Sequence, residues 1–191
     1  DYIQPQLQAF IQAGIRNVHV GLTNTGTAGL PERIKPLGTL LDAVRAGLPI
    51  RYEDDGDWTI SKGMSASDSQ FNLIGYSYGS LLAAQTANFY ARQGHIVDHL
   101  VLIGSPIDSG FLEKLKGTSG IKKVVILDLT DKGDPLHAGM GQTELLEARP
   151  TLARQFSANR AEGHFYYAQP VPESPRRWKA LAERIASEGL R

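Results

Sequence analysis

The sequence predicts an α/β protein with a mostly parallel sheet that is flanked by helices on both faces. Short runs of Val, Ile and Leu alternate along the chain with segments of helical spacing, and this order is typical of a parallel sheet covered on both sides. The 191 residues are 41% hydrophobic, which is enough for one domain with a sizeable core. Since no long linker divides the chain, we predict a single domain over 1–191.

The first third of the chain combines one predicted strand with helices and polar loops. An alternating, Val-rich pattern predicts the strand, and helical spacing that stops at glycine predicts the helices. In order, the predicted elements are a helix over 5–14, a strand over 15–22, a loop over 24–29, a helix broken by proline over 31–47 and a polar excursion over 53–69.

The remainder alternates more regularly between the two kinds of element. Apolar runs predict strands, and amphipathic stretches that Gly or Pro delimits predict helices. The predicted strands cover 71–75, 97–104, 122–130 and 153–160, and the predicted helices cover 80–94, 109–117, part of 143–153 and 175–191.

Composition and charge exclude several classes of protein. Twenty basic and twenty acidic residues give a formal net charge of zero, so we expect no nucleic-acid partner. The chain has no cysteine, which excludes disulfides and thiolate metal sites, and no metal or other cofactor is predicted. No apolar run reaches the roughly 18 residues of a membrane span, and the N-terminus has no signal-peptide pattern.

The chain does not begin with Met. We therefore consider it as the catalytic part of a longer protein, including a protein that is secreted or delivered to another cell. The compartment is not specified, and we expect a soluble protein.

The pattern GYSYG (75–79) carries the main chemical signal. It lies between predicted strand 71–75 and predicted helix 80–94, which is the context of a nucleophile elbow. Its two glycines allow a turn too tight for Cβ atoms, and the helix N-terminus favours developing negative charge. We predict Ser77 as a nucleophile and the Tyr78 N–H as an oxyanion donor. The alternative is an ordinary turn with Ser77 as the N-cap.

A serine nucleophile needs a general base, for which the chain offers five histidines. We predict His164, because it lies in a loop before the last helix. His137 is expected to line the cleft or lie on the surface. His19 falls within a predicted strand and is expected to be structural. His95 and His99 flank the join between predicted helix 80–94 and predicted strand 97–104, where we expect surface residues.

The base in turn needs an orienting acid, and three aspartates are candidates. Asp134 and Asp131 both follow predicted strand 122–130, and Asp134 ranks first because an Asp-Pro pair favours a turn there. Asp131 is the alternative acid and Asp108 ranks third. Each could instead be a solvated carboxylate or a helix cap.

Aromatic residues cluster around the predicted nucleophile and base. Tyr76 and Phe165 are predicted to contact substrate, and further tyrosines flank them at 78, 166 and 167. These rings favour an apolar acyl group, unless they only pack the loops. Segments 27–69 and 135–152 are predicted as possible caps over the cleft.

These sequence patterns resemble the α/β-hydrolase superfamily. The resemblance rests on GYSYGS (75–80), DKGDP (131–135) and GHF (163–165), in that order along the chain. It implies a triad of Ser77, Asp134 and His164 that works through an acyl-enzyme without a cofactor. The run over 80–106 is also similar to thioesterases and some lipases.

The resemblance departs from the superfamily pattern at the N-terminus. Such hydrolases usually have earlier strands and a Gly-rich loop that supplies the second oxyanion N–H. Here strand 15–22 looks like the superfamily's fourth, so the first strands are expected to be absent. Backbone near the N-terminus, or the loop over 23–26, is the expected second donor.

Together, these features predict a serine hydrolase that cleaves carboxylic esters of a lipid or another apolar acyl substrate. Lipase, phospholipase and carboxylesterase activities come first. An acyl thioesterase is the second hypothesis. A non-catalytic binding module with the hydrolase fold is the third, and it is weakened because all three triad candidates are present. The expected partner is a small ester or lipid molecule.

Overall fold

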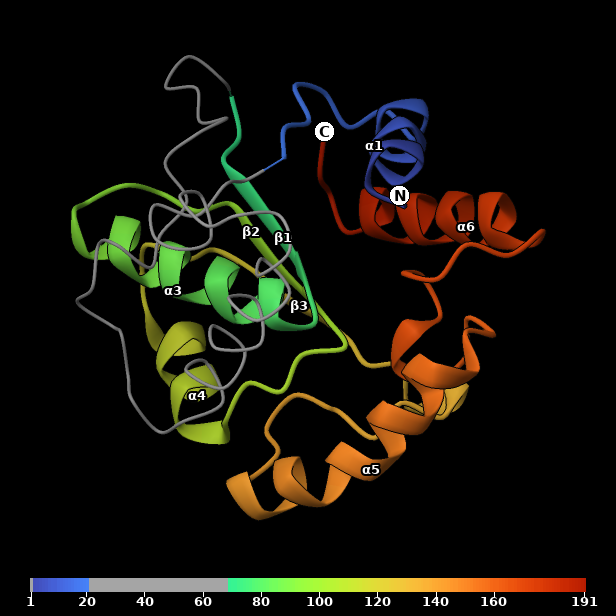
Figure 1. Ribbon diagram of the computed structural model, residues 1–191. Helices are drawn as coiled ribbons and strands as arrows, with labels where there is room; N and C mark the ends of the chain where they lie inside the picture. The colour runs from blue at the N-terminus through green and yellow to red at the C-terminus, as the bar shows by residue number, and fades with distance from the viewer. Residues whose placement is uncertain (1, 21–68) are drawn as a thin grey trace, which may run out of the picture.

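The computed structural model describes residues 2–20 and 69–191. Within these residues the chain alternates helices with three strands, as Figure 1 shows. The elements are α1 (Ile3–Gln12), β1 (Asn72–Tyr76), α3 (Tyr78–Arg92), β2 (His99–Ile103), α4 (Ser109–Gly117), β3 (Val124–Leu127), α5 (Gln142–Ala158) and α6 (Ser174–Ser187), with short 3₁₀ turns η4 (Thr130–Lys132) and η5 (Gly163–Phe165).

The three strands form a parallel sheet in the order β1-β2-β3. Leu73 of β1 pairs with Leu100 of β2, and Leu100 pairs in turn with Val124 of β3. Helix α3 makes the connection from β1 to β2, and α4 makes the connection from β2 to β3. Each strand therefore pairs with the next strand in the chain through a helical crossover, as the α/β prediction requires.

The central strand β2 separates two apolar cores. Its five residues are all buried, and successive side chains point to opposite faces. Leu100 and Leu102 pack with α3 and α4, whereas Val101 and Ile103 pack with α1 and α6. Figure 1 shows the two pairs of helices on opposite sides of the sheet, which confirms the predicted layering.

Small and large apolar residues at helical spacing fix these helices against the sheet. Ala83, Ala84 and Ala87 of α3 are fully buried, so this helix approaches the sheet closely. Trp178 and Ile185 bring α6 onto the other face. Each large side chain that is buried in this way contributes roughly 1.5–3 kcal/mol.

The predicted strand over 15–22 is wrong for the residues that can be described. Residues 15–20 are irregular, and Asn17 has a left-handed backbone with φ 53°, which interrupts an extended chain. The N–H of Ile15 donates to Phe10 and so closes the end of α1. Residues 21–22, like predicted elements 24–29 and 31–47, lie outside the described residues.

The predicted strand over 153–160 is also wrong, because α5 continues to Ala158. The inward residues of this helix, Leu145, Ala148, Leu152 and Gln155, recur every three or four positions, which is helical spacing. Asn159 ends the helix in a left-handed conformation. The possible cap 135–152 thus consists of a loop and most of α5, and the described part of 27–69 is only its last residue.

No helix in the described ranges combines the length and the apolar character that crossing a bilayer demands.

Candidate active site

Ser77 lies at the turn from β1 into α3 with an unusual backbone. Its φ is 56° and its ψ is −127°, a region that a residue with a side chain rarely occupies. The Ser77 N–H donates to the Ile103 carbonyl over 2.9 Å, and its own carbonyl accepts the N–H and hydroxyl of Ser80. Ser77 occupies the N-cap position of α3, but its side chain makes no capping hydrogen bond.

Of the two glycines around Ser77, Gly75 is the one that contacts with the described residues require. A Cβ on Gly75 would lie 2.3 Å from the Gly79 carbonyl oxygen and 2.4 Å from the Ser80 Cα. A Cβ on Gly79 would meet no described atom within 4 Å. The expectation that both glycines avoid a collision is therefore correct for Gly75, whereas none of the described residues requires a glycine at 79.

We expect Gly75→Ala to lower the free energy of unfolding by about 3 kcal/mol, because backbone must shift to admit the methyl group. Gly79→Ala is the matched control. It should leave stability unchanged or raise it by up to about 1 kcal/mol, since alanine is the better helix former. Urea denaturation of both variants measures the difference, and an equal loss in both would contradict the steric argument.

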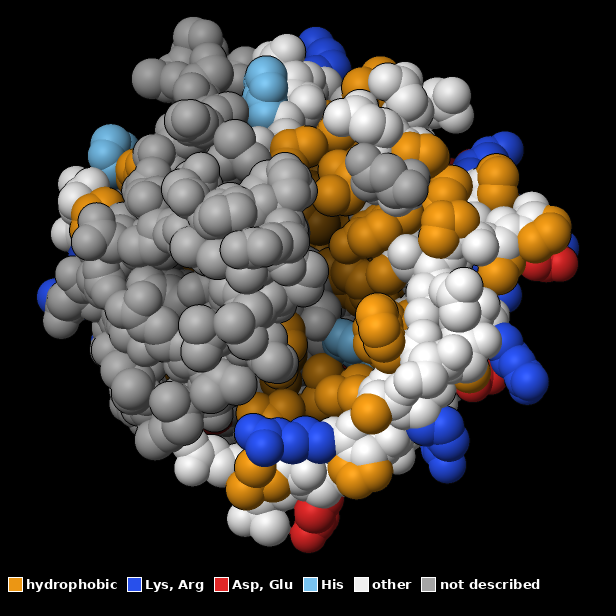
Figure 2. All heavy atoms as spheres, in the orientation of Figure 1, with side chains coloured by type: hydrophobic (Ala, Val, Ile, Leu, Met, Phe, Trp, Pro, Cys, Tyr) orange, Lys and Arg blue, Asp and Glu red, His pale blue; other side chains and the backbone are white. Residues whose placement is uncertain are grey.

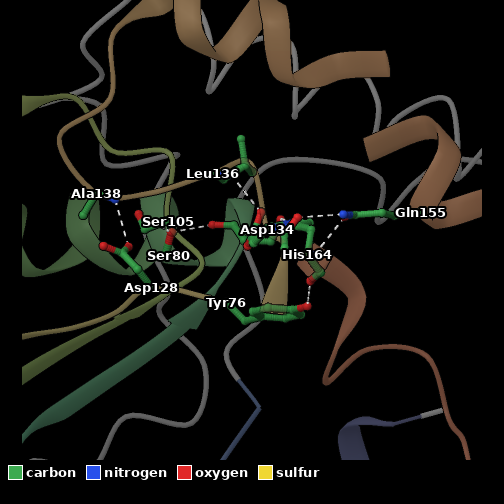
Figure 3. A network of polar contacts seen from close by, with 11 residues as sticks. Tyr76, Ser80, Ser105, Asp128, Asp134, Leu136, Ala138, Gln155 and His164 are labelled. Carbon is green, nitrogen blue, oxygen red and sulfur yellow. Dashed lines mark hydrogen bonds and ion pairs between the residues drawn. The ribbon is translucent and has the colours of Figure 1, made fainter. Parts of the chain in front are cut away.

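His164 connects the serine to a carboxylate. Its Nε2 lies 2.6 Å from the Ser77 Oγ, and its Nδ1 lies 2.8 Å from the Asp134 Oδ2. With the Nδ1–H donated to the carboxylate, Nε2 is left as the acceptor of the serine proton. His164 and Asp134 are both 4% exposed, and Figure 3 shows the two side by side.

The acid is oriented by its own backbone surroundings. The Asp134 N–H donates to the Leu129 carbonyl over 3.0 Å, and Oδ1 accepts the Leu136 N–H over 2.8 Å. Gly104 lies next to the Asp134 and His164 side chains and has a φ of 52°. A Cβ at this position would lie 3.0 Å from the Asp134 Oδ2 and 3.6 Å from the His164 Nδ1. Sequence reasoning missed Gly104, because it placed this residue inside predicted strand 97–104, whereas β2 ends at Ile103.

The other candidate acids are not brought to His164. Asp131 has a side chain that is 67% exposed, and it pairs with Lys132 over 2.7 Å. Asp108 caps α4 by accepting the Phe111 N–H over 2.9 Å. Asp131 is therefore a solvated carboxylate and Asp108 is a helix cap, which are the two alternative roles considered for these aspartates.

The other four histidines lie away from Ser77. His137 is partly exposed, with Nε2 3.6 Å from Glu144, and His95 and His19 are exposed. His99 differs from the surface position expected for it: the ring is buried, its Nδ1 lies 2.7 Å from the Asn72 Oδ1, and burial lowers its pKa.

Tyr76 and Phe165, the predicted substrate contacts, both touch the His164 ring. Tyr76 stacks on it with centroids 5.6 Å apart and an interplanar angle of 21°. Phe165 meets it edge to face at 5.3 Å. The Tyr76 hydroxyl donates to the His164 carbonyl, and burial raises the pKa of that hydroxyl, which keeps it a neutral donor.

Tyr78 is the first residue of α3, so its N–H is one of the amides that a helix leaves without an internal acceptor. Burial raises the pKa of its phenol, and the charge of Arg149 opposes that change.

Near the N-terminus, Tyr2 packs edge to face on Tyr76 at 6.4 Å. The loop over 23–26, which was the alternative source of the second oxyanion donor, lies outside the described residues.

A cleft of 470 Å³ runs along β1 beside α1. Tyr76 and Gly79, on either side of Ser77 in the sequence, line this cleft together with apolar side chains such as Phe10 and Ile74, whereas Ser77 and His164 do not line it. Figure 2 shows that the hollow of this face has a largely hydrophobic floor. Within the described ranges, no three His, Cys, Asp or Glu side chains are grouped as metal ligands would be.

The parallel sheet, its helical layers and the serine at the strand-to-helix turn define an α/β-hydrolase. The chain belongs to the thioesterase domain family, whose model matches residues 64–188. This family is part of the α/β-hydrolase superfamily, so the predicted resemblance is confirmed, and the protein is in general terms a hydrolase of acyl esters. No curated protein and no solved structure matches the chain.

Proposed function

We propose that this chain hydrolyses acyl esters with Ser77 as nucleophile, His164 as general base and Asp134 as orienting acid. The observation that carries the proposal is the continuous line of polar contacts, 2.6 Å from Ser77 to His164 and 2.8 Å from His164 to Asp134. Strain at Ser77 and the burial of the other two residues support it, because functional sites often hold residues in unfavourable conformations. We further propose that residues 1–191 act as one domain.

In the proposed reaction, His164 removes the Ser77 proton while the hydroxyl oxygen attacks the acyl carbonyl carbon. The Tyr78 N–H, at the positive end of α3, stabilises the oxyanion together with a second donor. The leaving alcohol or thiol takes the proton from His164 and departs. Water then attacks the acyl-enzyme with His164 again as the base, which releases the acid and restores the serine.

For the substrate, we put acyl thioesters ahead of oxygen esters, which reverses the order that the sequence favoured. The family to which the chain belongs is named for thioester hydrolysis. The apolar walls of the cleft beside Tyr76 favour a hydrophobic acyl group in either case. A carboxylic ester of a lipid is the second candidate, because the same walls suit its acyl chain.

The nucleophile is tested by labelling with a fluorophosphonate probe and mapping the adduct by mass spectrometry. We expect one adduct on the peptide that contains Ser77, and no adduct on Ser77→Ala. A folded wild-type protein that stays unlabelled would favour the binding-module hypothesis. Labelling of another serine would contradict the assignment.

The substrate class is tested with matched acyl chains presented as acyl-CoA thioesters, p-nitrophenyl esters and phospholipids. A higher kcat/KM for the thioester series is the expected result. Lengthening the acyl chain should raise kcat/KM in every series if the apolar cleft binds it. Preference for phospholipid over the other two would instead support the lipase hypothesis.

A further inference from the structure

Gln155 connects the two loops that carry the acid and the base. It lies on α5 with only 6% of its surface exposed, and both ends of its amide are used. Nε2 donates to the carbonyl of Gly133 over 2.8 Å, and Oε1 accepts the N–H of His164 over 3.0 Å. Gly133 directly precedes Asp134, so one side chain bridges the residue beside the acid and the base itself (Figure 3).

The fit around this amide is close. A Cβ on Gly163 would lie 2.1 Å from the Gln155 Nε2, so only a residue without a side chain leaves room for it. Tyr76 holds the other side of the loop that contains His164, because its hydroxyl donates to the His164 carbonyl. The backbone N–H and carbonyl of His164 are therefore bound by side chains from two different elements, α5 and β1.

We propose that Gln155 is a positioning residue that holds the His164 loop and the Asp134 loop in register, so that the imidazole meets the carboxylate and the serine together. The inference rests on the proposed function of Ser77, His164 and Asp134. The side-chain amide of Gln155 hydrogen-bonds to the backbone of the two loops that carry the acid and the base. Its loss should therefore affect the chemical step more than substrate binding.

The chain offers a matched control in Gln169. This glutamine is 7% exposed, and it also bonds to backbone at both ends, accepting the Ala161 N–H and donating to the Phe156 carbonyl over 3.0 Å each. Its partners are neither Gly133 nor His164. Replacement by methionine removes two backbone hydrogen bonds at either position and keeps a similar side-chain volume.

We expect Gln155→Met to lower kcat by roughly 10- to 100-fold, since displacements of about 1 Å can cost that much. KM should change by less than about three-fold. Gln169→Met should lower the melting temperature to a similar degree but keep kcat within about three-fold of the wild type. In NMR spectra, the low-field Nδ1 proton of His164 should broaden or vanish in Gln155→Met and persist in Gln169→Met.

Equal kcat losses in the two variants, or no loss in Gln155→Met, would overturn the inference while leaving the proposed function intact. If Gln155→Met does not fold, Gln155→Glu is judged by the same criteria. That variant keeps the acceptor for the His164 N–H and lacks the donor to Gly133. Wild-type turnover by Ser77→Ala, measured in parallel, would instead contradict the proposed function, and the inference with it.

Discussion

Replacement of His164 by alanine is expected to lower kcat by about 10⁴-fold or more, because members of a catalytic triad act as a unit. The imidazole Nε2 lies 2.6 Å from the Ser77 hydroxyl and is the proton acceptor in the proposed mechanism. Without it, the serine would have to attack with its proton still bound. Steady-state kinetics on an acyl ester or thioester measures the loss, and circular dichroism verifies that the variant is folded.

His137→Ala is the control for this prediction. That imidazole lies 3.6 Å from the Glu144 carboxylate at a partly exposed position. Its removal should change kcat by less than about three-fold, as is usual for substitutions away from the reacting atoms. A large loss in His137→Ala together with an active His164→Ala would show that the base has been misassigned.

Asp134→Asn is expected to lower kcat by about 10³- to 10⁴-fold with little change in fold. The carboxylate accepts the His164 Nδ1–H at one oxygen and the Leu136 N–H at the other. An amide has only one acceptor atom, so its NH₂ group must face one of these two donors. The imidazole is then pushed towards the tautomer that carries a proton on Nε2, which cannot accept the serine proton.

Asp131→Asn provides the comparison at the neighbouring candidate. Its carboxylate is largely exposed and paired with Lys132, and exposed ion pairs contribute less than about 1 kcal/mol. We expect kcat to stay within about two-fold of the wild type. If kcat is lost in Asp131→Asn and retained in Asp134→Asn, the loop must rearrange in solution and the acid must be reassigned.

Local patterns allowed the parallel sheet to be predicted, and they singled out the candidate residues that the structure brings together. The apolar runs and the helical segments between them are visible in the sequence, whereas the strand order came from the structure. Ser77 and His164 each stand in a short sequence context that can be read without knowing the fold. The choice between Asp134 and Asp131 could only be ranked, because both follow the same strand. It depends on the turn of η4, after which Gly133 adopts φ 86°.

The features that were missed depend on contacts between distant positions. Gln155 meets a partner 22 positions earlier and another 9 positions later, and its own segment was predicted as a strand. Gly79 resembles Gly75 in sequence, yet only coordinates reveal which of them faces backbone. The irregular 15–20 segment has a strand-like composition, and a single left-handed residue at Asn17 decides against a strand.

The order of the parts along the chain has a consequence for biosynthesis. Among the described strands, β2 pairs with β1 and β3 pairs with β2, so this part of the sheet can assemble while the ribosome is still at work. The histidine, however, follows the serine by 87 positions. On the proposed mechanism, a nascent chain therefore contains Ser77 well before its proton acceptor has been made, and we expect it to be inactive towards esters until the loop of His164 has emerged.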